Sequence, residues 1–395
     1  MQLAFLSLLL AVDLLAMDDL LRTVSWVLGG IFAGTVALFA FWRARSILRV
    51  WRAPKRPLRS VQARIWRDPG DVSQLDLAAG PGGREGRPLP PFTFLEEHTT
   101  GSQPCVSMRD GRGSVWRVKW GDEVNAEALS TRLAWAAGYF VETTYYVAEG
   151  RLEGATGLQR AAACIDDNGR FRDARFELDE PDVEKHFDEH SWAWHDNPFV
   201  GTCELNGLKI VMMWLSNWDA KDVRDVARGS NTAVFEYTLP SGLREARYLI
   251  IDWGGALGRW GSTVVSRGRW DCQAFALENP AFVTGVNGEY LQFGYTGQRT
   301  SDIVDDIRIS DARWLLDRLD ALTEAQITEA VRASGGTEDE AMIFSRALRD
   351  RLDRLREAAR HPAAALVSNA EATESLTPLD TPCESRAGSG GPALQ

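Results

Sequence analysis

The sequence predicts an α+β protein with two lobes behind a single N-terminal transmembrane helix. Three observations support this prediction. β-prone runs dominate residues 92–178, helical patterns dominate residues 197–361, and an uncharged apolar stretch at residues 24–42 precedes both. With 395 residues, 45% of them hydrophobic, the chain is long enough to bury a sizeable core.

The uncharged stretch at residues 24–42 reads VSWVLGGIFAGTVALFAFW. At about 1.5 Å per residue its helical length nearly matches a hydrocarbon core of roughly 30 Å. Trp26 and Trp42 lie near its ends, where interfacial aromatics occur. A buried core helix is the alternative. Residues 3–12 are also apolar but lack a basic region before them, so a cleaved signal peptide is not favoured.

The charge pattern predicts on which side of the membrane the C-terminal part of the chain lies. Residues 43–60 carry seven basic side chains and no acid, while the whole chain has a net charge of −11, so the rest stands at −11 − 7 = −18. The positive-inside rule then places the C-terminal part in the cytoplasm, on the inner membrane; a periplasmic or extracellular location is the alternative. Residues 43–59 are expected to contact anionic lipid. The acidic remainder argues against nucleic-acid binding.

Composition divides the rest of the chain. Residues 1–23 precede the predicted span, and residues 43–91 form a basic juxtamembrane stretch that ends in the Gly/Pro-rich run AAGPGGREGRPLPP. We expect the run to be a linker and the fold to begin near Phe92. Residues 179–196 are acidic and are expected to connect the lobes. Residues 362–395 are rich in Pro, Ser, Gly and Thr, which predicts disorder.

Turn and cap residues predict the elements of the small lobe. Asp110-Gly111-Arg112-Gly113 lies between two β-prone runs and indicates a hairpin, and Asn168-Gly169 indicates a second one. Between them, Asn125 is the expected N-cap of a helix that stops at Gly138.

The large lobe is predicted in the same way. ELNGLKIVMMWL reads as a long buried helix, and TAVFEY and RYLIID read as two strands joined by a turn. Helix starts are expected at Ser310, at Thr323 with Gln326, and at Thr337 with Glu340. In the last helix one apolar stripe is expected to face the core: Phe344, Leu348, Leu352 and Leu355.

Six polar residues stand in an order that phosphoryl transfer requires. The chain presents a strand with a single lysine expected to point inward, a helix carboxylate, an aspartate and a lysine after a buried helix, an asparagine before a strand, and an aspartate after the next strand: Lys119, Glu127, Asp219, Lys221, Asn231 and Asp252. A strand lysine neutralises nucleotide phosphates and is oriented by a helix carboxylate. Asn and Asp oxygens hold Mg²⁺, and another Asp accepts or orients the substrate hydroxyl.

This order resembles the protein-kinase-like superfamily, and its atypical HipA-type and phosphatidylinositol 3/4-kinase branches most, over roughly residues 100–260. The resemblance implies a two-lobed fold that uses ATP and Mg²⁺. It also implies Lys119 as the phosphate lysine with Glu127 as its partner, Asp219 and Lys221 as catalytic-loop residues, and Asp252 as metal ligand. The motifs W-x-V-K-x-G, NPF-x-G-x-x-E-L-N-G-L and NWD-x-K also resemble a family of bacterial proteins, which implies no activity.

The sequence departs from the kinase pattern in three places. The residue five positions after Asp219 is Arg224 rather than Asn. Either VRDVARG is an insertion and Asn231 is the metal ligand, or the Mg²⁺ site is incomplete. The phosphate-covering G-x-G-x-x-G is absent, so the Asp110–Gly113 turn could approach phosphates only through its backbone. Asn217-Trp218-Asp219 replaces His-Arg-Asp.

Other functions stay open at this point. A nucleotide-binding pseudokinase-like module without turnover, or a structural membrane scaffold with these charges on its surface, would fit the same residues. A zinc site is a weaker alternative, from His186, His190 and His195. The five scattered cysteines predict unpaired thiols. The phosphoacceptor is undetermined among a protein hydroxyl, a lipid headgroup and a small metabolite.

Overall fold

A computed structural model describes residues 58, 62–99, 101, 103–186 and 191–360, and six helical residues between positions 26 and 35. The predicted membrane span at residues 24–42 therefore lies largely outside the described residues, as do the seven basic residues after it and the predicted disordered tail. None of the helices in the described part is long and apolar enough to cross a membrane. Within the described ranges, residues 58–225 and 229–360 belong to one compact unit.

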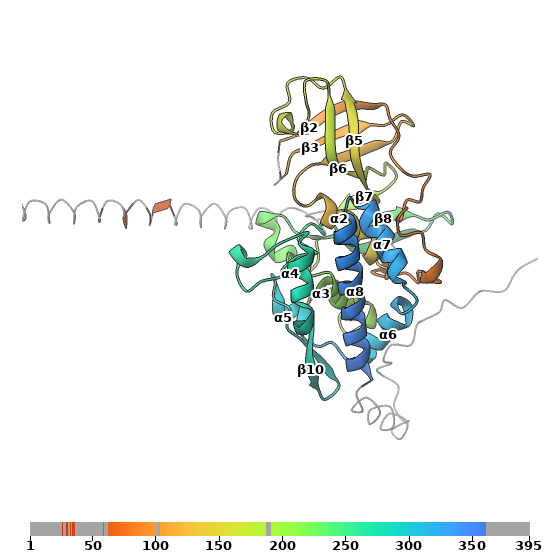
Figure 1. Ribbon diagram of the computed structural model, residues 1–395, viewed down its shortest axis with the longest axis vertical. Coiled ribbons are helices and arrows are strands. Elements are labelled where there is room, and N and C mark those ends of the chain that lie inside the picture. Colours follow the sequence, from red (N-terminus) through yellow and green to blue (C-terminus); the bar gives the residue numbers. More distant parts are fainter. Residues whose placement is uncertain are drawn as a thin grey trace, which may run out of the picture. The chain divides into compact units, whose positions relative to one another are not determined.

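The small lobe is a closed five-stranded barrel (Figure 1). Its strand order is β2-β3-β4-β6-β5, with bounds β2 Phe92–His98, β3 Cys105–Arg109, β4 Val115–Lys119, β5 Thr144–Glu153 and β6 Arg170–Leu178. Side chains from alternate positions fill its interior, among them Trp116, Val118 and Phe176. The next positions along β4 and β6 therefore face outward, so the expectation that Lys119 points inward is wrong, because its neighbour Val118 takes the interior position. The β3–β4 hairpin is confirmed at the Asp110–Gly113 turn.

The helix α2 (Val124–Ala136) follows β4, and 11 of its 13 residues are buried. It packs against β5 and β6 of the barrel and against α7 (Glu324–Ala333) of the large lobe, so it is covered on several sides. The expected N-cap is wrong: Glu123 holds that position, because the Asn125 amide donates to the Ser334 carbonyl instead. The helix does end before Gly138, whose φ is 92°.

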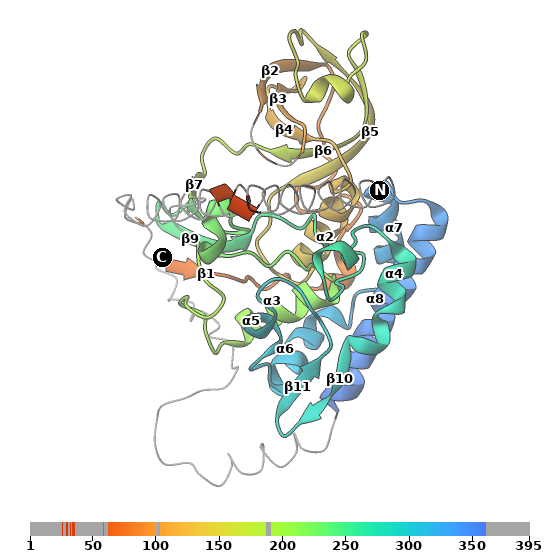
Figure 2. The same cartoon turned by 90° about the vertical axis from the view of Figure 1, so that its left-hand side faces the viewer.

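The large lobe is built around the buried helix α3 (Cys203–Trp214), as its apolar sequence predicts. Around it lie the remaining helices: α4 Cys272–Leu277, α5 Thr300–Val304, α6 Ile309–Leu319, α7 and α8 Glu338–Ala359. The β10–β11 hairpin (Val283–Asn287, Tyr290–Phe293) projects at the far end from the barrel (Figure 2). The capping boxes at Thr323 and Thr337 are confirmed. The expected cap at Ser310 is wrong: the N-cap of α6 is Arg308, two residues earlier.

The expectations that the Gly/Pro-rich run is a linker and that the fold begins near Phe92 are wrong, because residues 62–91 are packed against the domain; we name them the strap. β1 (Gln62–Arg64) pairs in parallel with β9 (Arg244–Ile250). Four apolar strap residues are buried: Ile65, Val72, Leu77 and Ala79. The Gln326 side chain donates to strap carbonyls. A Gly/Pro-rich composition indicates an irregular backbone, and here that backbone is bonded to distant residues.

The acidic connection between the lobes includes a short strand. β7 (Glu184–His186) pairs with β8 (Thr232–Thr238) at the edge of the sheet β1-β9-β8-β7. Trp192 and Trp194 are buried, so this segment is part of the core as well as a connection.

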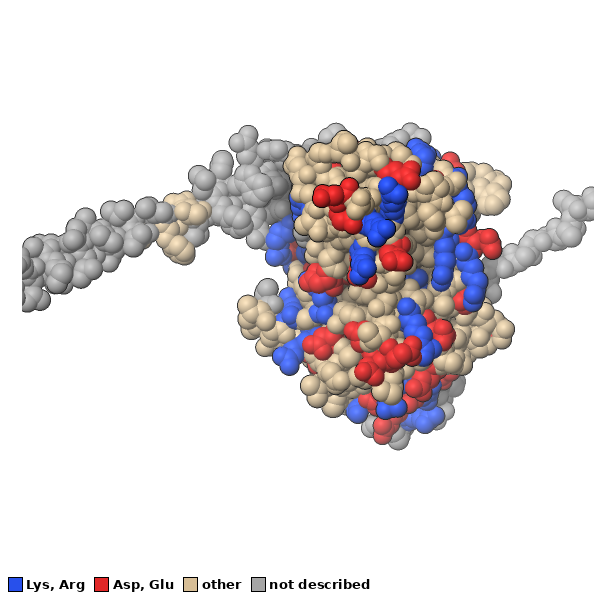
Figure 3. Space-filling model, turned by 45° about the horizontal axis from the view of Figure 1, so that its top comes forward, with Lys and Arg blue, Asp and Glu red and all other residues tan. Residues whose placement is uncertain are grey.

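Acidic and basic side chains are interspersed on the face seen in Figure 3, which shows no broad basic area. Cys105, Cys164 and Cys272 are free thiols, but Cys203 is disulfide-bonded, so the expectation of unpaired thiols is wrong for Cys203.

Candidate active site

Asp219 lies in the loop that follows α3, and other side chains contact both of its carboxylate oxygens. Lys221 Nζ lies 3.2 Å from Oδ2, and Gln298 Nε2 donates to Oδ1 at 2.8 Å. Only 13% of the Asp219 side chain is exposed. Because each carboxylate oxygen has two lone pairs, these contacts leave Asp219 able to accept one further hydrogen bond at each oxygen.

Asn217 joins this loop to the segment after β9. Its Nδ2 donates to the Asp252 carbonyl at 3.2 Å, and its Oδ1 accepts from the Asp219 backbone N–H at 3.2 Å. Asn217 is fully buried. A Cβ on Gly255 would lie 2.9 Å from Asp219 Cβ, so only glycine permits the approach of these two segments. The Asn-Trp-Asp and Asp-Trp-Gly-Gly motifs are therefore packed against each other.

Asn231 is brought back to Asp219 although twelve residues separate them. Its Nδ2 donates to the Asp219 carbonyl at 2.7 Å, and its backbone N–H donates to the Lys221 carbonyl at 3.1 Å. The intervening VRDVARG segment forms the 3-10 helix Val223–Arg228. The structure thus loops this segment out and places Asn231 beside Asp219 and Lys221.

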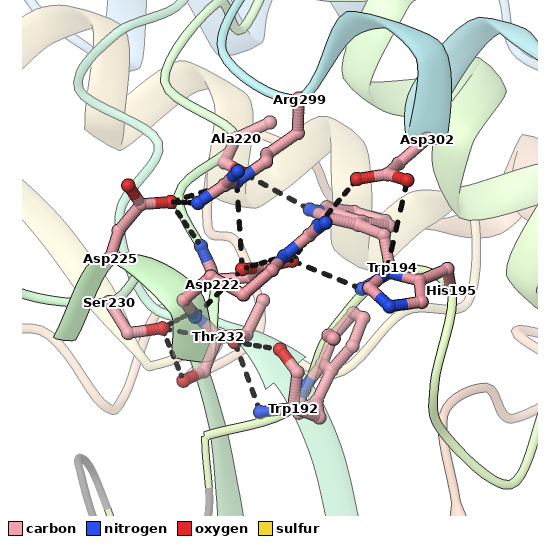
Figure 4. A network of polar contacts seen from close by, with 12 residues as sticks. Trp192, Trp194, His195, Ala220, Asp222, Asp225, Ser230, Thr232, Arg299 and Asp302 are labelled. Carbon is pink, nitrogen blue, oxygen red and sulfur yellow. Dashed lines mark hydrogen bonds and ion pairs between the residues drawn. The ribbon is translucent and has the colours of Figure 1, made fainter. Parts of the chain in front are cut away.

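A buried network fixes the looped-out segment (Figure 4). The fully buried Asp222 pairs with Arg224, which also contacts Asp302, while Arg299 pairs with Asp225 at 2.7 Å. Arg224, which stands where the kinase pattern has Asn, is therefore engaged in this network rather than with Asp219.

Asp252 stands at the same end of the sheet as Asn231. β8 and β9 are antiparallel with Thr232 opposite Ile250, and the Ile251 N–H donates to the Asn231 carbonyl at 2.9 Å. Asn231 and Asp252 therefore flank the first and last residues of one hairpin. Asp252 Oδ1 accepts from the Gly254 N–H at 3.0 Å.

The side-chain oxygens of Asn231 and Asp252, at this end of the β8–β9 hairpin, suit Mg²⁺. Asn231 Oδ1 and Asp252 Oδ2 have no hydrogen-bond partner within the described ranges, and hard oxygen donors are what Mg²⁺ prefers when substrate phosphates supply the other ligands. The described residues contain no group of three or more His, Cys, Asp or Glu side chains that could hold a metal ion by themselves. Of the three histidines considered for zinc, His195 lies 3.8 Å from Asp302.

Lys119 lies on the barrel face that meets α2 and Glu127 lies on α2, but the two side chains are not paired with each other. Glu127 Oε1 is 2.6 Å from Arg175 Nη1, and both side chains are buried. Lys119 is half-buried and forms no ion pair with any residue that the structure describes. The ion pair expected between Lys119 and Glu127 is therefore absent here, and Glu127 pairs with Arg175 instead.

The buried charges shift one another's pKa values. Burial and the nearby Asp252 charge raise the pKa of Glu127 to about 8, although Arg175 and Lys119 oppose the shift. Burial likewise raises the pKa of Asp219, with Asp252 adding to it and Lys221 opposing it. A raised pKa suits a carboxylate that must accept a proton.

The Asp110–Gly113 turn is not where phosphates would bind. Cys105 stands opposite Lys119 in the β3–β4 ladder, so this turn lies at the other end of β4 from Lys119. The Asp110 carboxylate accepts the N–H groups of Arg112 and Ser114, and the Gly111 N–H donates to the Leu89 carbonyl. The β2–β3 connection, which follows His98, lies at the Lys119 end instead.

Three contributors were missed by the sequence prediction: Asn217, Arg175 and Gln298. Asn217 had a signal, because it belongs to the NWD motif and precedes the catalytic aspartate. Gln298 had none, since 79 residues separate it from Asp219. Arg175 lies in a β-prone run with other arginines, so nothing in the sequence distinguishes it.

No protein-family model matches the sequence, and no curated protein matches it significantly. Among the solved structures that it resembles are two kinases. The Golgi casein kinase with Mn/ADP bound has 9% identity, a TM-score of 0.36, and coverage of 74% of this chain and 77% of that one. The Rio2 kinase–ADP/Mg²⁺–phosphoaspartate complex from Chaetomium thermophilum has 12% identity, a TM-score of 0.25, and coverage of 66% and 72%. TM-scores this low decide nothing about the chemistry of this chain.

Proposed function

We propose that this chain is a membrane-anchored phosphotransferase of the atypical kinase-like kind that uses ATP and Mg²⁺. The observation that carries the proposal is the place of Asn231. Its amide donates to the Asp219 carbonyl at 2.7 Å while its backbone pairs with Ile251, one residue before Asp252. The departure at Arg224 is thereby explained as an insertion, and the amide and carboxylate oxygens needed for Mg²⁺ stand at one sheet end.

Each site residue then has a role in the proposed reaction. Lys119, half-buried and without an ion pair in the described part of the chain, binds the nucleotide phosphates. Asn231 and Asp252 hold Mg²⁺, which neutralises charge on the phosphates when it is bound. Asp219 orients the acceptor hydroxyl and accepts its proton, and Lys221 beside it offsets the charge.

The second candidate is a pseudokinase-like module that binds nucleotide without turnover. The absence of a G-x-G-x-x-G sequence favours it, because such a loop covers the phosphates in protein kinases. The buried and supported Asp219 favours the enzyme, because nucleotide binding alone does not need this residue.

The test separates binding from transfer. Thermal unfolding with and without Mg²⁺ and ATP measures binding, since a ligand at a hundredfold excess over Kd stabilises by about 2.7 kcal/mol. ADP release measures turnover. We expect Asp252→Asn to lose Mg²⁺-dependent binding, and Asp219→Asn to keep binding but lose turnover. Asp317→Asn, on the exposed face of α6, is the control. A wild-type protein without Mg²⁺-dependent nucleotide binding would sink the proposal, and binding without turnover would favour the pseudokinase.

The membrane anchor and the cytoplasmic location are proposals as well. They rest on the length of the apolar stretch at residues 24–42 and on the basic residues at 43–59 that follow it. The acceptor is left open, and anionic lipid near residues 43–59 is a contact rather than an assigned substrate.

A further inference from the structure

We infer that Arg175 is a positioning residue of this site: it holds Glu127, and through Glu127 the Asp252 segment, so that Lys119 stays free for the nucleotide. The inference rests on the proposed function. Arg175 takes the place that the kinase resemblance gives to Lys119 as the partner of Glu127, and the Arg175–Glu127 pair lies in the protein interior.

Arg175 is placed by the barrel. It stands in β6 directly opposite Lys119 in β4, on the outward face that meets α2. Its guanidinium binds Glu127 at 2.6 Å and Glu177 at 2.8 Å, and all three side chains are at least 93% buried. A planar guanidinium with several donors can hold two carboxylates at once, which an ammonium group does less well.

Glu127 also contacts the segment that contains Asp252. Its other oxygen, Oε2, accepts the backbone N–H of Trp253 at 3.3 Å. Trp253 follows Asp252 directly and is itself buried, with its indole N–H donating to the Ile250 carbonyl at 3.2 Å. One carboxylate therefore ties β6, α2 and the Asp-Trp-Gly motif together without a ligand.

Lys119 is left outside this arrangement. It lies near enough to lower the pKa values of Glu127 and Glu177 by its charge, yet it pairs with neither. Because Arg175 already satisfies Glu127, α2 need not move to orient Lys119 when the nucleotide binds.

Double-mutant cycles test the inference, with the affinity for Mg-ATP as the readout at a pH above the pKa of Glu127. One cycle combines Arg175→Gln with Glu127→Gln, and the other combines Lys119→Met with Glu127→Gln. We expect Arg175→Gln to weaken Mg-ATP binding about tenfold, a coupling of about 1.4 kcal/mol with Glu127→Gln. The Lys119 and Glu127 effects should multiply within about twofold, as independent sites do. Arg172→Gln, exposed on the same strand, is the matched control.

A merely structural Arg175 would couple with Glu127 in stability but not in Mg-ATP affinity or in the Mg²⁺ concentration needed for binding. Should Arg175→Gln fail to fold, Arg175→Lys serves in its place and should show a smaller loss of affinity. Coupling of Lys119 with Glu127, or unchanged affinity in both Arg175 variants, overturns the inference while leaving the proposed function intact. A wild-type protein that binds no Mg-ATP removes both.

Discussion

Replacing Asn231 with alanine tests the metal site most directly. Asn231 is 3% exposed and donates one hydrogen bond to the Asp219 carbonyl at 2.7 Å. Losing a buried hydrogen bond of this kind costs about 1–2 kcal/mol, which lowers Tm by roughly 2–4 °C per kcal/mol in a domain of this size. If Oδ1 is also a Mg²⁺ ligand, the Mg²⁺ concentration for half-maximal turnover should rise at least about tenfold.

The assay is a Mg²⁺ titration of ADP release at saturating ATP, with Tm measured on the same samples. Asn206→Ala is the matched control, because Asn206 is also buried, at 4% exposure, and its amide donates to Asp311 at 2.7 Å in α6, outside the site. Both variants should lose similar stability, but only Asn231→Ala should change the Mg²⁺ titration. If both variants lose stability and both keep the wild-type Mg²⁺ dependence, Asn231 stabilises the Asp219 loop and is not a Mg²⁺ ligand.

Three further predictions concern stability and topology. The pKa of Glu127 is raised from 4.5 to about 8, so between these pH values the folded state holds a proton that the unfolded state has released. The free energy of unfolding should therefore fall as pH rises from about 4.5 to about 8, by at most about 1.4 kcal/mol per pH unit. Urea unfolding of Glu127→Gln should show a weaker dependence of stability on pH. Trp66→Ala should cost about 2–4 kcal/mol by calorimetry, because it removes an edge-on ring contact with Trp314 and a hydrogen bond to the Ala137 carbonyl; an unchanged Tm would show that the strap is not stabilising. A reporter fused to the C-terminus should be active in the cytoplasm, and activity only outside it would contradict the charge argument from residues 43–60.

The catalytic-loop region could be predicted because its local patterns are strong. The apolar run of α3 and the β8–β9 turn signal predict where Asp219 and Asp252 lie, in the segments that follow α3 and β9. The role of Asn231 could not be chosen from the sequence, because the spacing from Asp219 departs from the kinase pattern. Only the register of Thr232 opposite Ile250 places it beside Asp252.

The rest depended on contacts between distant residues. Gln298 reaches Asp219 across 79 positions, and β1 pairs with β9 across more than 180. Neither contact leaves a periodic pattern, since a single side chain or a three-residue strand is too short to show one. The Gly/Pro-rich part of the strap likewise shows no periodic pattern, so its sequence predicts a linker.

The state of Asp219 bears on whether the site performs chemistry. Burying a carboxylate costs stability unless its partners compensate, and here the pKa of Asp219 is raised by burial and by Asp252 despite Lys221. Gln298 donates to Asp219 Oδ1 at 2.8 Å, and Asn217 accepts from the Asp219 backbone N–H. These contacts fix the orientation of the Asp219 carboxylate. A module that only binds nucleotide gains nothing from this arrangement, because phosphates and Mg²⁺ are held by Lys119, Asn231 and Asp252 in the proposed scheme. An oriented carboxylate with a raised pKa is what accepting a hydroxyl proton requires, and this favours transfer over binding alone.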